Sequence, residues 1–255
     1  MQSTFSRSAL SLILTLAVSV LLSGCSVFGV EEDPSTWPVE RVYQEARQAL
    51  NNEDYEVAID HYESLISRYP FGDYAKQAQL DVAYAYYKFD EPESAISAAN
   101  HFIKLYPRHE RVDYAIYLKG LVRFNQGADN IDSLFKLDPT ERDPGSSRES
   151  LQYFRELTSR YPDSPYTHDA QQRIIYLHNK LARHEIHVID YYLRRGAYLA
   201  AANRAKAVLV RYQQTPSVVD ALQMMVQAYR QLKLDDLAAD AQRVLELNFP
   251  EYKDS

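Results

Sequence analysis

The tripeptide Arg68-Tyr69-Pro70 ends in an aromatic residue followed by proline. The same pattern recurs three times along the chain, at Leu105-Tyr106-Pro107, Arg160-Tyr161-Pro162 and Asn248-Phe249-Pro250. Arg211-Tyr212-Gln213 follows the same pattern without the proline. Pro70 and Pro107 are 37 residues apart, whereas the steps from Pro107 to Pro162 and from Tyr161 to Tyr212 are 55 and 51 residues. The spacing therefore predicts five units of 37 residues, one lengthened by 18 residues and one by 14.

Each unit contains two amphipathic stretches, which is the pattern of a helix pair. In the first unit apolar side chains recur every three or four residues, at Tyr43, Ala46 and Leu50 and again at Ala58, Tyr62, Leu65 and Ile66. This spacing puts an apolar stripe on one face of each helix. Small residues recur 37 residues apart at Ala46, Ala83 and Gly120, where they would let paired helices approach closely. Proline ends the second helix because it has no N–H and its predecessor avoids the helical region.

The composition agrees with a helical chain. Only 7 of 255 residues are glycine, which argues against all-β sandwiches, against phosphate-binding loops and for few left-handed helix caps. Lys and Arg number 28 against 35 Asp and Glu, a net charge of −7, so no nucleic-acid partner is expected.

The order of alanine, aromatic, apolar residue and proline in each unit resembles the tetratricopeptide repeat, with Ser150 in place of one alanine. The resemblance implies an all-α fold, a right-handed solenoid of five tetratricopeptide-like helix pairs over residues 39–250. A single unit cannot bury its apolar face, so neighbouring units stack and form a concave groove.

The two insertions differ in character. Residues 128–147 contain two Asp-Pro pairs and a glycine, which predicts a loop insertion in repeat three. Residues 166–195 contain no glycine and no proline, which predicts that the first helix of repeat four is lengthened to nearly 30 residues. Gly196 follows two arginines, as is typical of a helix C-terminus. We expect the lengthened helix to present a docking surface.

The N-terminus has the features of a secretory signal peptide. Arg7 precedes an apolar run over 9–22, which is too short to cross a bilayer, and small residues follow it. The sequence Leu22-Ser23-Gly24-Cys25 resembles the bacterial lipobox, which implies cleavage after residue 24 and lipid attachment at Cys25. A retained membrane anchor, or a chance cysteine in an ordinary signal peptide, are the alternatives. Ser26, rather than Asp, then indicates the outer membrane. Residues 25–38 read as a lipidated tether and 251–255 as a tail.

Signatures of catalysis are absent from the sequence. No Ser/His/Asp signature, glycine-rich loop or cysteine pair appears, so a non-enzymatic protein without cofactor beyond the lipid on Cys25 is expected. His184 and His187 lie one turn apart without a third ligand, and we interpret them as a solvated helix face rather than a metal site.

The mature chain also resembles the BamD family of lipoproteins of the outer-membrane β-barrel assembly machine. The resemblance rests on Arg68–Tyr74, Asp81–Lys88, Asp113–Leu121, Arg142–Pro144, Tyr191–Tyr198 and Asn203-Arg204. It implies a scaffold on the periplasmic face of the outer membrane that binds BamA and the smaller Bam lipoproteins and helps receive unfolded outer-membrane proteins. The alternatives are another periplasmic adaptor, in cell-wall or division work, and a lipidated hydrolase.

Two sets of site residues follow from these resemblances. The C-terminal half of the family contacts BamA, and the basic cluster there predicts an interface at Arg194, Arg195, Tyr198 and Arg204, with Arg204 paired to a carboxylate of the partner. The first helices of tetratricopeptide repeats line the groove, which predicts substrate-peptide contacts at Tyr43, Arg47, Leu80, Tyr84, Tyr87, Tyr117 and Phe124, with Leu121 beside them. This aromatic groove suits a peptide with an aromatic end. The alternatives are a solvated Arg204 and tyrosines that pack against neighbouring helices.

Overall fold

The computed structural model describes residues 36–126, 140 and 144–252, and over them the regular structure is helical. The helices are α2 (Val39–Asn51), α3 (Tyr55–Arg68), α4 (Asp73–Lys88), α5 (Pro92–Leu105), α6 (Val112–Gln126), α8 (Gly145–Arg160), α9 (Thr167–Arg194), α10 (Tyr198–Arg211), α11 (Ser217–Gln231), α12 (Asp235–Asn248) and the short η2 (Pro250–Tyr252). Cys25 and the predicted signal peptide lie outside the described residues.

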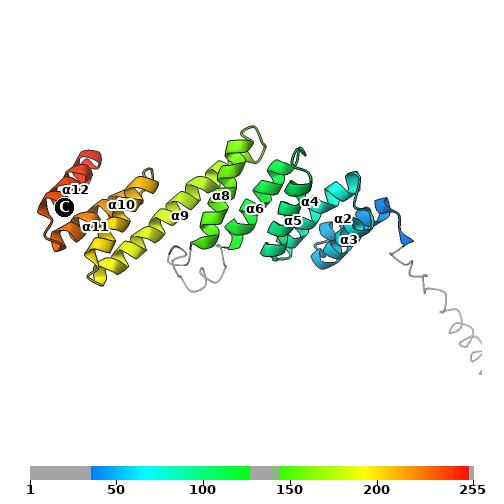
Figure 1. The fold of residues 1–255 in the computed structure, drawn as a ribbon, viewed down its shortest axis with the longest axis horizontal. Coiled ribbons are helices and arrows are strands. Elements are labelled where there is room, and N and C mark those ends of the chain that lie inside the picture. Colours follow the sequence, from blue (N-terminus) through cyan, green and yellow to red (C-terminus); the bar gives the residue numbers. More distant parts are fainter. Residues whose placement is uncertain (1–35, 127–139, 141–143, 253–255) are drawn as a thin grey trace, which may run out of the picture.

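The helices form five antiparallel pairs stacked in one elongated row (Figure 1). The pairs are α2 with α3, α4 with α5, α6 with α8, α9 with α10, and α11 with α12. The predicted all-α solenoid of five helix pairs is confirmed over these residues. The lengthened helix is confirmed too, because α9 has 28 residues and runs obliquely across the row between α8 and α10.

In the four pairs whose turn the structure describes, one turn residue lies in the left-handed region. That residue is Glu53, Asp90, Gly196 or Lys233, with φ of +66°, +61°, +72° and +58°. Two backbone hydrogen bonds close each turn, as where Asp54 N–H donates to Ala49 O and Glu53 N–H to Leu50 O. Three of these four positions hold residues other than glycine, so the expectation of few left-handed caps was wrong. The closing hydrogen bonds outweigh the cost of about 1 kcal/mol or more per residue.

The aromatic-proline motif ends the second helix of each pair, as predicted. The aromatic residue leaves the helical conformation, with φ −127° and ψ 69° at Tyr69, and its N–H donates four residues back, for example from Tyr69 to Leu65 O at 2.8 Å. The accepting residues are all wholly or almost wholly buried: Leu65, Phe102, Leu157, Val208 and Leu245. The motif therefore joins a helix end to the core in every repeat, including the one that lacks proline.

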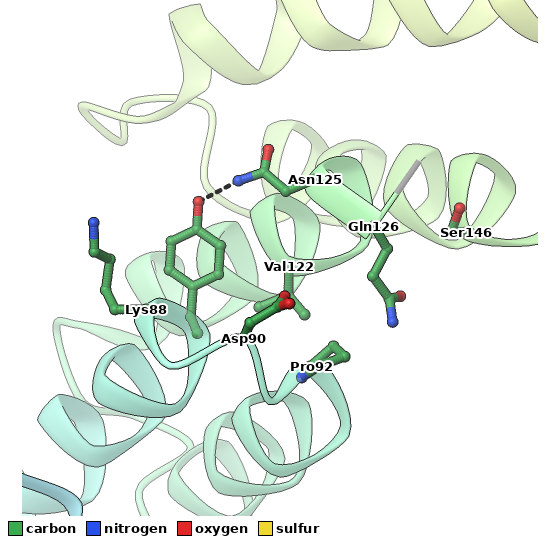
Figure 2. Close-up of a pocket in the computed structure, with 8 residues that line it drawn as sticks. Lys88, Asp90, Pro92, Val122, Asn125, Gln126 and Ser146 are labelled. Atoms are coloured by element: carbon green, nitrogen blue, oxygen red, sulfur yellow. Dashed lines mark hydrogen bonds between the residues drawn. The ribbon is translucent and has the colours of Figure 1, made fainter. Parts of the chain in front are cut away.

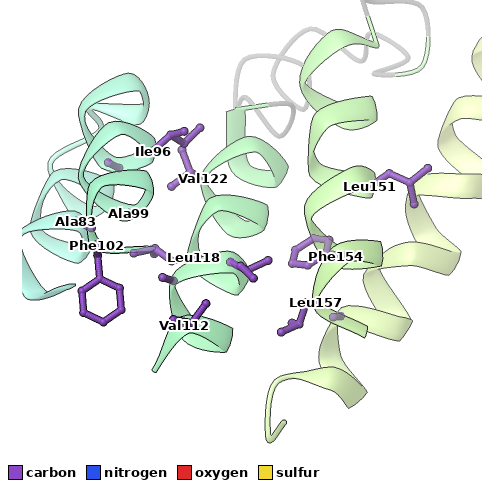
Figure 3. Packing of buried hydrophobic residues seen from close by; sticks show 14 of the residues in the cluster. Ala83, Ile96, Ala99, Phe102, Val112, Leu118, Val122, Leu151, Phe154 and Leu157 are labelled. Atoms are coloured by element: carbon purple, nitrogen blue, oxygen red, sulfur yellow. The ribbon is translucent and has the colours of Figure 1, made fainter. Parts of the chain in front are cut away.

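Small side chains let the third pair close up around a phenylalanine. Figure 3 shows Phe154 and Leu157 of α8 projecting toward α6. A Cβ atom placed on Gly120 would lie 2.5 Å from the Phe154 ring. Ser150 is fully buried and donates to Gly120 O at 2.9 Å, so the serine that replaces alanine joins the same contact.

The structure differs from the sequence interpretation at the edges of two segments. Helix α8 already begins at Gly145, so the last three residues assigned to the loop insertion are helical. Trp37, assigned to the tether, is half-buried, and its carbonyl accepts a hydrogen bond from Arg68 at 2.9 Å. The indole of Trp37 has a large apolar surface, and it packs against the core of the first repeat because this removes that surface from water.

We predict that Gly120→Ala destabilises the protein by about 1–3 kcal/mol, because the added methyl group overlaps the Phe154 ring. In a Phe154→Leu background the ring is gone, and the same change should be neutral or favour the helix by about 0.5–1 kcal/mol. Urea unfolding of the four chains measures both effects. An equal loss in both backgrounds would contradict the contact.

Candidate functional site

The face formed by the first helices begins with two adjoining cavities between α2 and α4. Their volumes are about 630 and 430 Å³, and Tyr43 and Arg47 line both. Asp81 of α4 lies in the smaller one, where it accepts hydrogen bonds from the Tyr43 hydroxyl at 2.9 Å and from Gln77 Nε2 at 2.8 Å. The structure thus places the predicted Tyr43 and Arg47 in a real groove.

The floor of this groove is polar, and its side chains are half-buried or buried. Burial raises the pKa of the Asp81 carboxyl above its usual value, although its hydrogen bonds with Gln77 and Tyr43 favour the charged form. Burial and the nearby Asp81 raise the pKa of the Tyr43 hydroxyl. The fully buried Tyr62 also borders the cavity, and its hydroxyl has no hydrogen-bond partner among the described residues.

Arg47, predicted as a substrate-peptide contact, is the cation of this groove that could clamp a peptide carboxylate, but its surroundings do not favour that role. The side chain is exposed and lies over the Tyr43 ring, 5.9 Å from the ring centre. Asp81 lines the same cavity, so a second carboxylate there would meet a like charge. The groove instead offers donors and acceptors together, which suits the backbone or an uncharged polar end of a peptide.

The prediction for Leu80 is wrong. Leu80 is 1% exposed and belongs to the hydrophobic core. The residues of α4 that line the smaller cavity are Gln77 and Asp81, four residues apart, and the half-buried Tyr84 follows three residues later. Leu80 precedes Asp81 by one residue, which rotates its side chain by about 100° toward α5. The recurrence of polar side chains at helical spacing was the signal that could have identified Asp81.

Tyr84 and Tyr87 continue the face toward α6. Their ring centres are 6.1 Å apart, and both rings are half-buried. The Tyr87 hydroxyl accepts a hydrogen bond from Asn125 Nδ2 at 2.5 Å across a cavity of about 680 Å³ (Figure 2). Lys88, Asp90 and Ser146 also border this cavity, so its lining is mostly polar.

Tyr117 and Phe124 extend the aromatic row from α6 to α9. Tyr117 stacks on Tyr166, with ring centres 4.8 Å apart, and donates to Asp169 at 2.7 Å. Burial and this hydrogen bond raise the pKa of Tyr117 to about 12. Phe124 lies beneath the Arg173 guanidinium at 4.6 Å. Leu121 packs on the core beside them. These rings have partners within the chain, as the alternative interpretation expected, and they retain partly exposed surface.

The residues predicted for the second interface lie in two places. Arg194 and Arg195 are exposed at the end of α9, where Arg194 pairs with Asp190 at 2.9 Å and Arg195 lies 5.3 Å from the Tyr191 ring centre. Tyr198 was expected to be exposed, and the structure corrects this: it is half-buried against the C-terminal core. The exposed tyrosine of this end is Tyr191.

Arg204 faces a different part of α9. Its Nη1 donates to Glu185 Oε2 at 3.0 Å, and its side chain is 45% exposed. Glu185 precedes Arg194 by nine residues, or about 14 Å along the helix. The predicted partner carboxylate is thus replaced, in the isolated chain, by a buried one of the same chain. Nothing in the sequence pattern singles out Glu185, because it lies between two histidines on a helix rich in charge.

His184 and His187 are not a solvated face. His184 Nδ1 is 2.8 Å from the Thr140 carbonyl, and His187 Nε2 is 2.8 Å from the Thr140 hydroxyl. Thr140 is a residue of the segment predicted as the insertion of repeat three, and both imidazoles contact it. No group of three or more metal-ligating side chains occurs among the described residues. Within the same residues, no helix has both the length and the apolar character needed to span a membrane.

Comparison with known proteins gives consistent results. The sequence profile of the YfiO family, described as an outer membrane lipoprotein, matches residues 36–245. The outer membrane protein assembly factor BamD of Neisseria gonorrhoeae is 43% identical over 243 residues, 94% of this chain and 91% of that protein. The BamD protein of Neisseria meningitidis serogroup A is 44% identical with the same shares covered. BamD of Vibrio cholerae is 37% identical, over 91% of this chain and 97% of that protein.

Proposed function

The chain belongs to the BamD family of outer membrane protein assembly factors, the YfiO lipoproteins, and from this premise we propose its molecular role. It is a non-catalytic scaffold that binds the barrel component BamA and the smaller Bam lipoproteins and receives unfolded outer-membrane proteins. The observation that carries this proposal is the row of polar and aromatic side chains along α2, α4, α6 and α9, together with the separate basic end of α9.

The N-terminal part of the row is the proposed substrate groove. Tyr43 and Arg47 border its polar end, and Tyr84, Tyr87, Tyr117 and Phe124 follow along the next two first helices. An extended peptide with an aromatic end could stack on the half-buried rings, each contact adding about 0.5–1.5 kcal/mol beyond burial. Several such contacts support micromolar binding. Because the hydroxyls of Tyr43, Tyr87 and Tyr117 already have partners, the rings are held in place before a peptide arrives.

The C-terminal part is the proposed docking surface for BamA. Arg204 keeps nearly half of its side chain exposed, and its planar fork can pair with a carboxylate. Arg194 and Arg195 at the end of α9, with the half-buried Tyr198 at the start of α10, form the other part of this proposed surface. A division of the array into a receiving half and a docking half suits a scaffold, because both can be occupied at once.

The chain is anchored by lipid on Cys25, at the periplasmic face of the outer membrane. The support is the lipobox-like sequence, since residue 25 lies outside the described residues. Several acyl chains, at about 0.8 kcal/mol per buried methylene, anchor a protein stably, whereas one chain alone is marginal. No other cofactor is part of the proposal.

The first prediction concerns the anchor. Cys25→Ala should abolish incorporation of radioactive palmitate and move the protein from the membrane fraction to the soluble fraction, because the chain contains no other cysteine. Labelled protein in cells that express only the variant would refute lipid attachment at Cys25.

The second prediction concerns the groove. A peptide that ends in phenylalanine should bind the full-length protein in detergent, and the double variant Tyr84→Ala/Tyr87→Ala should weaken binding at least about tenfold. Fluorescence anisotropy of a labelled peptide measures the affinity. Tyr191→Ala, which removes an exposed ring at the other end of the array, is the matched control and should bind normally. If a correctly folded double variant binds as well as the control, the groove assignment fails.

The third prediction concerns Arg204. Arg204→Gln should reduce recovery of BamA in pull-down from solubilised envelopes at least about tenfold, because it removes one partner of a charge pair that docking takes out of water. Glutamine is preferable to glutamate here, because a new carboxylate would face the buried Glu185 and could unfold the region. Arg243→Gln, an exposed arginine of α12, is the control. Unchanged recovery with Arg204→Gln at raised salt would contradict a central role.

A further inference from the structure

Helix α9 connects two separate hydrophobic cores. The central core includes α9 side chains up to Leu181, and the C-terminal core begins with Ile186 on the same helix. Glu185 lies at this boundary with only 5% of its surface exposed. A buried carboxylate at the joint between two cores requires compensation by cations, and removing its partner is strongly unfavourable.

Two arginines from different helices compete for this carboxylate. Arg204 of α10 donates to Glu185 Oε2 at 3.0 Å, whereas Arg148 of α8 lies 3.9 Å from Oε1, too far for a hydrogen bond. Both arginine side chains are about half exposed. In this state the hydrogen bond between Glu185 and Arg204 connects α9 to α10, and Arg148 of α8 lies nearby without a hydrogen bond to Glu185.

The neighbouring residues make Arg148 the cation that can replace Arg204 beside Glu185. Tyr212 packs against both cores, and the arginines besides Arg148 that act on its pKa are Arg155 of α8 and Arg211 of α10. On α9 itself, Arg183 pairs with Asp220, and His184 and His187 contact Thr140. Arg155 contacts His178, nearly two turns of α9 before Glu185. Arg148 is the cation that needs to move only about an ångström to donate to Glu185.

We propose that Glu185 competes with a partner carboxylate for Arg204. When a partner carboxylate binds Arg204, Glu185 loses its hydrogen bond to Arg204 and accepts one from Arg148 instead. The inference rests on the proposed docking role of Arg204. The buried carboxylate keeps one close cation in both states, so the exchange avoids an unpaired buried charge. Docking would then move the direct bond from the α9–α10 contact to the α8–α9 contact, which links the C-terminal interface to the half that carries the groove.

The test is the affinity of the full-length lipoprotein for BamA, both in detergent. Glu185→Gln keeps the shape but removes the competing charge, so binding should tighten about fivefold or more. Arg148→Gln removes the replacement cation, so binding should weaken by about the same factor. Arg155→Gln, two turns further along α8 and also exposed, is the matched control and should bind normally. In an Arg204→Gln background, neither Glu185→Gln nor Arg148→Gln should change the residual affinity.

The outcomes separate this inference from the docking proposal. If Arg204→Gln weakens binding but Glu185→Gln leaves it unchanged or weaker, Arg204 docks the partner and the competition is overturned. If Arg204→Gln binds normally, both proposals fall. Arg148→Gln changes a half-exposed side chain, so it remains informative if Glu185→Gln does not fold; normal affinity in that variant overturns the transfer to Arg148.

Discussion

Each repeat depends on the close approach of its two helices at glycine or alanine, whose side chains leave room for the backbones to meet. In the third pair Gly120 lies against the Phe154 ring, and the buried Ser150 hydroxyl donates to the Gly120 carbonyl. Ala46, Ala83, Ala58 and Ala95 have the same role in the first two pairs, and none of them is exposed to solvent. When the backbones are this close, the large side chains of one helix extend beyond its partner and pack against the neighbouring pairs.

Stacking of the pairs places the first helices in one row, and this arrangement creates the candidate groove. No single helix contains the groove, because Tyr43 comes from α2, Asp81 from α4 and Tyr117 from α6. The tyrosine hydroxyls bond to side chains of the neighbouring helix, so the same residues that would contact a peptide also hold adjacent repeats in register. Function and stability are therefore coupled in this face, and variants there need a folding control.

The long helix α9 changes the character of the array halfway along. It belongs to both the central and the C-terminal core, and the ion pair of Glu185 with Arg204 lies where one core gives way to the other. Thr140 of the repeat-three insertion is held by His184 and His187, on either side of Glu185. The contacts of Thr140 and the Glu185–Arg204 pair therefore lie on neighbouring residues of one helix.

The sequence by itself determined the number of repeats and their division into helix pairs. It also determined the helix ends at the aromatic-proline motif and the length of α9, because periodicity and proline act locally along the chain. The groove was only partly predictable. Tyr43 and Arg47 line the cavities between α2 and α4, but Leu80 is buried and its neighbour Asp81 lines the cavity instead, since a shift of one residue turns a side chain by about 100°. The left-handed turns at Glu53, Asp90 and Lys233 were missed, because their hydrogen bonds override the preference for glycine.

Only the tertiary structure decided which charges meet. Arg204 and Glu185 are 19 residues apart, and Arg148 and Glu185 are 37 residues apart, so no local pattern joins them. The packing of α8 and α10 on opposite sides of α9 brings both arginines to one carboxylate. The free energy of an ion pair depends on burial and on distances of a few ångströms, and both are properties of the assembled array.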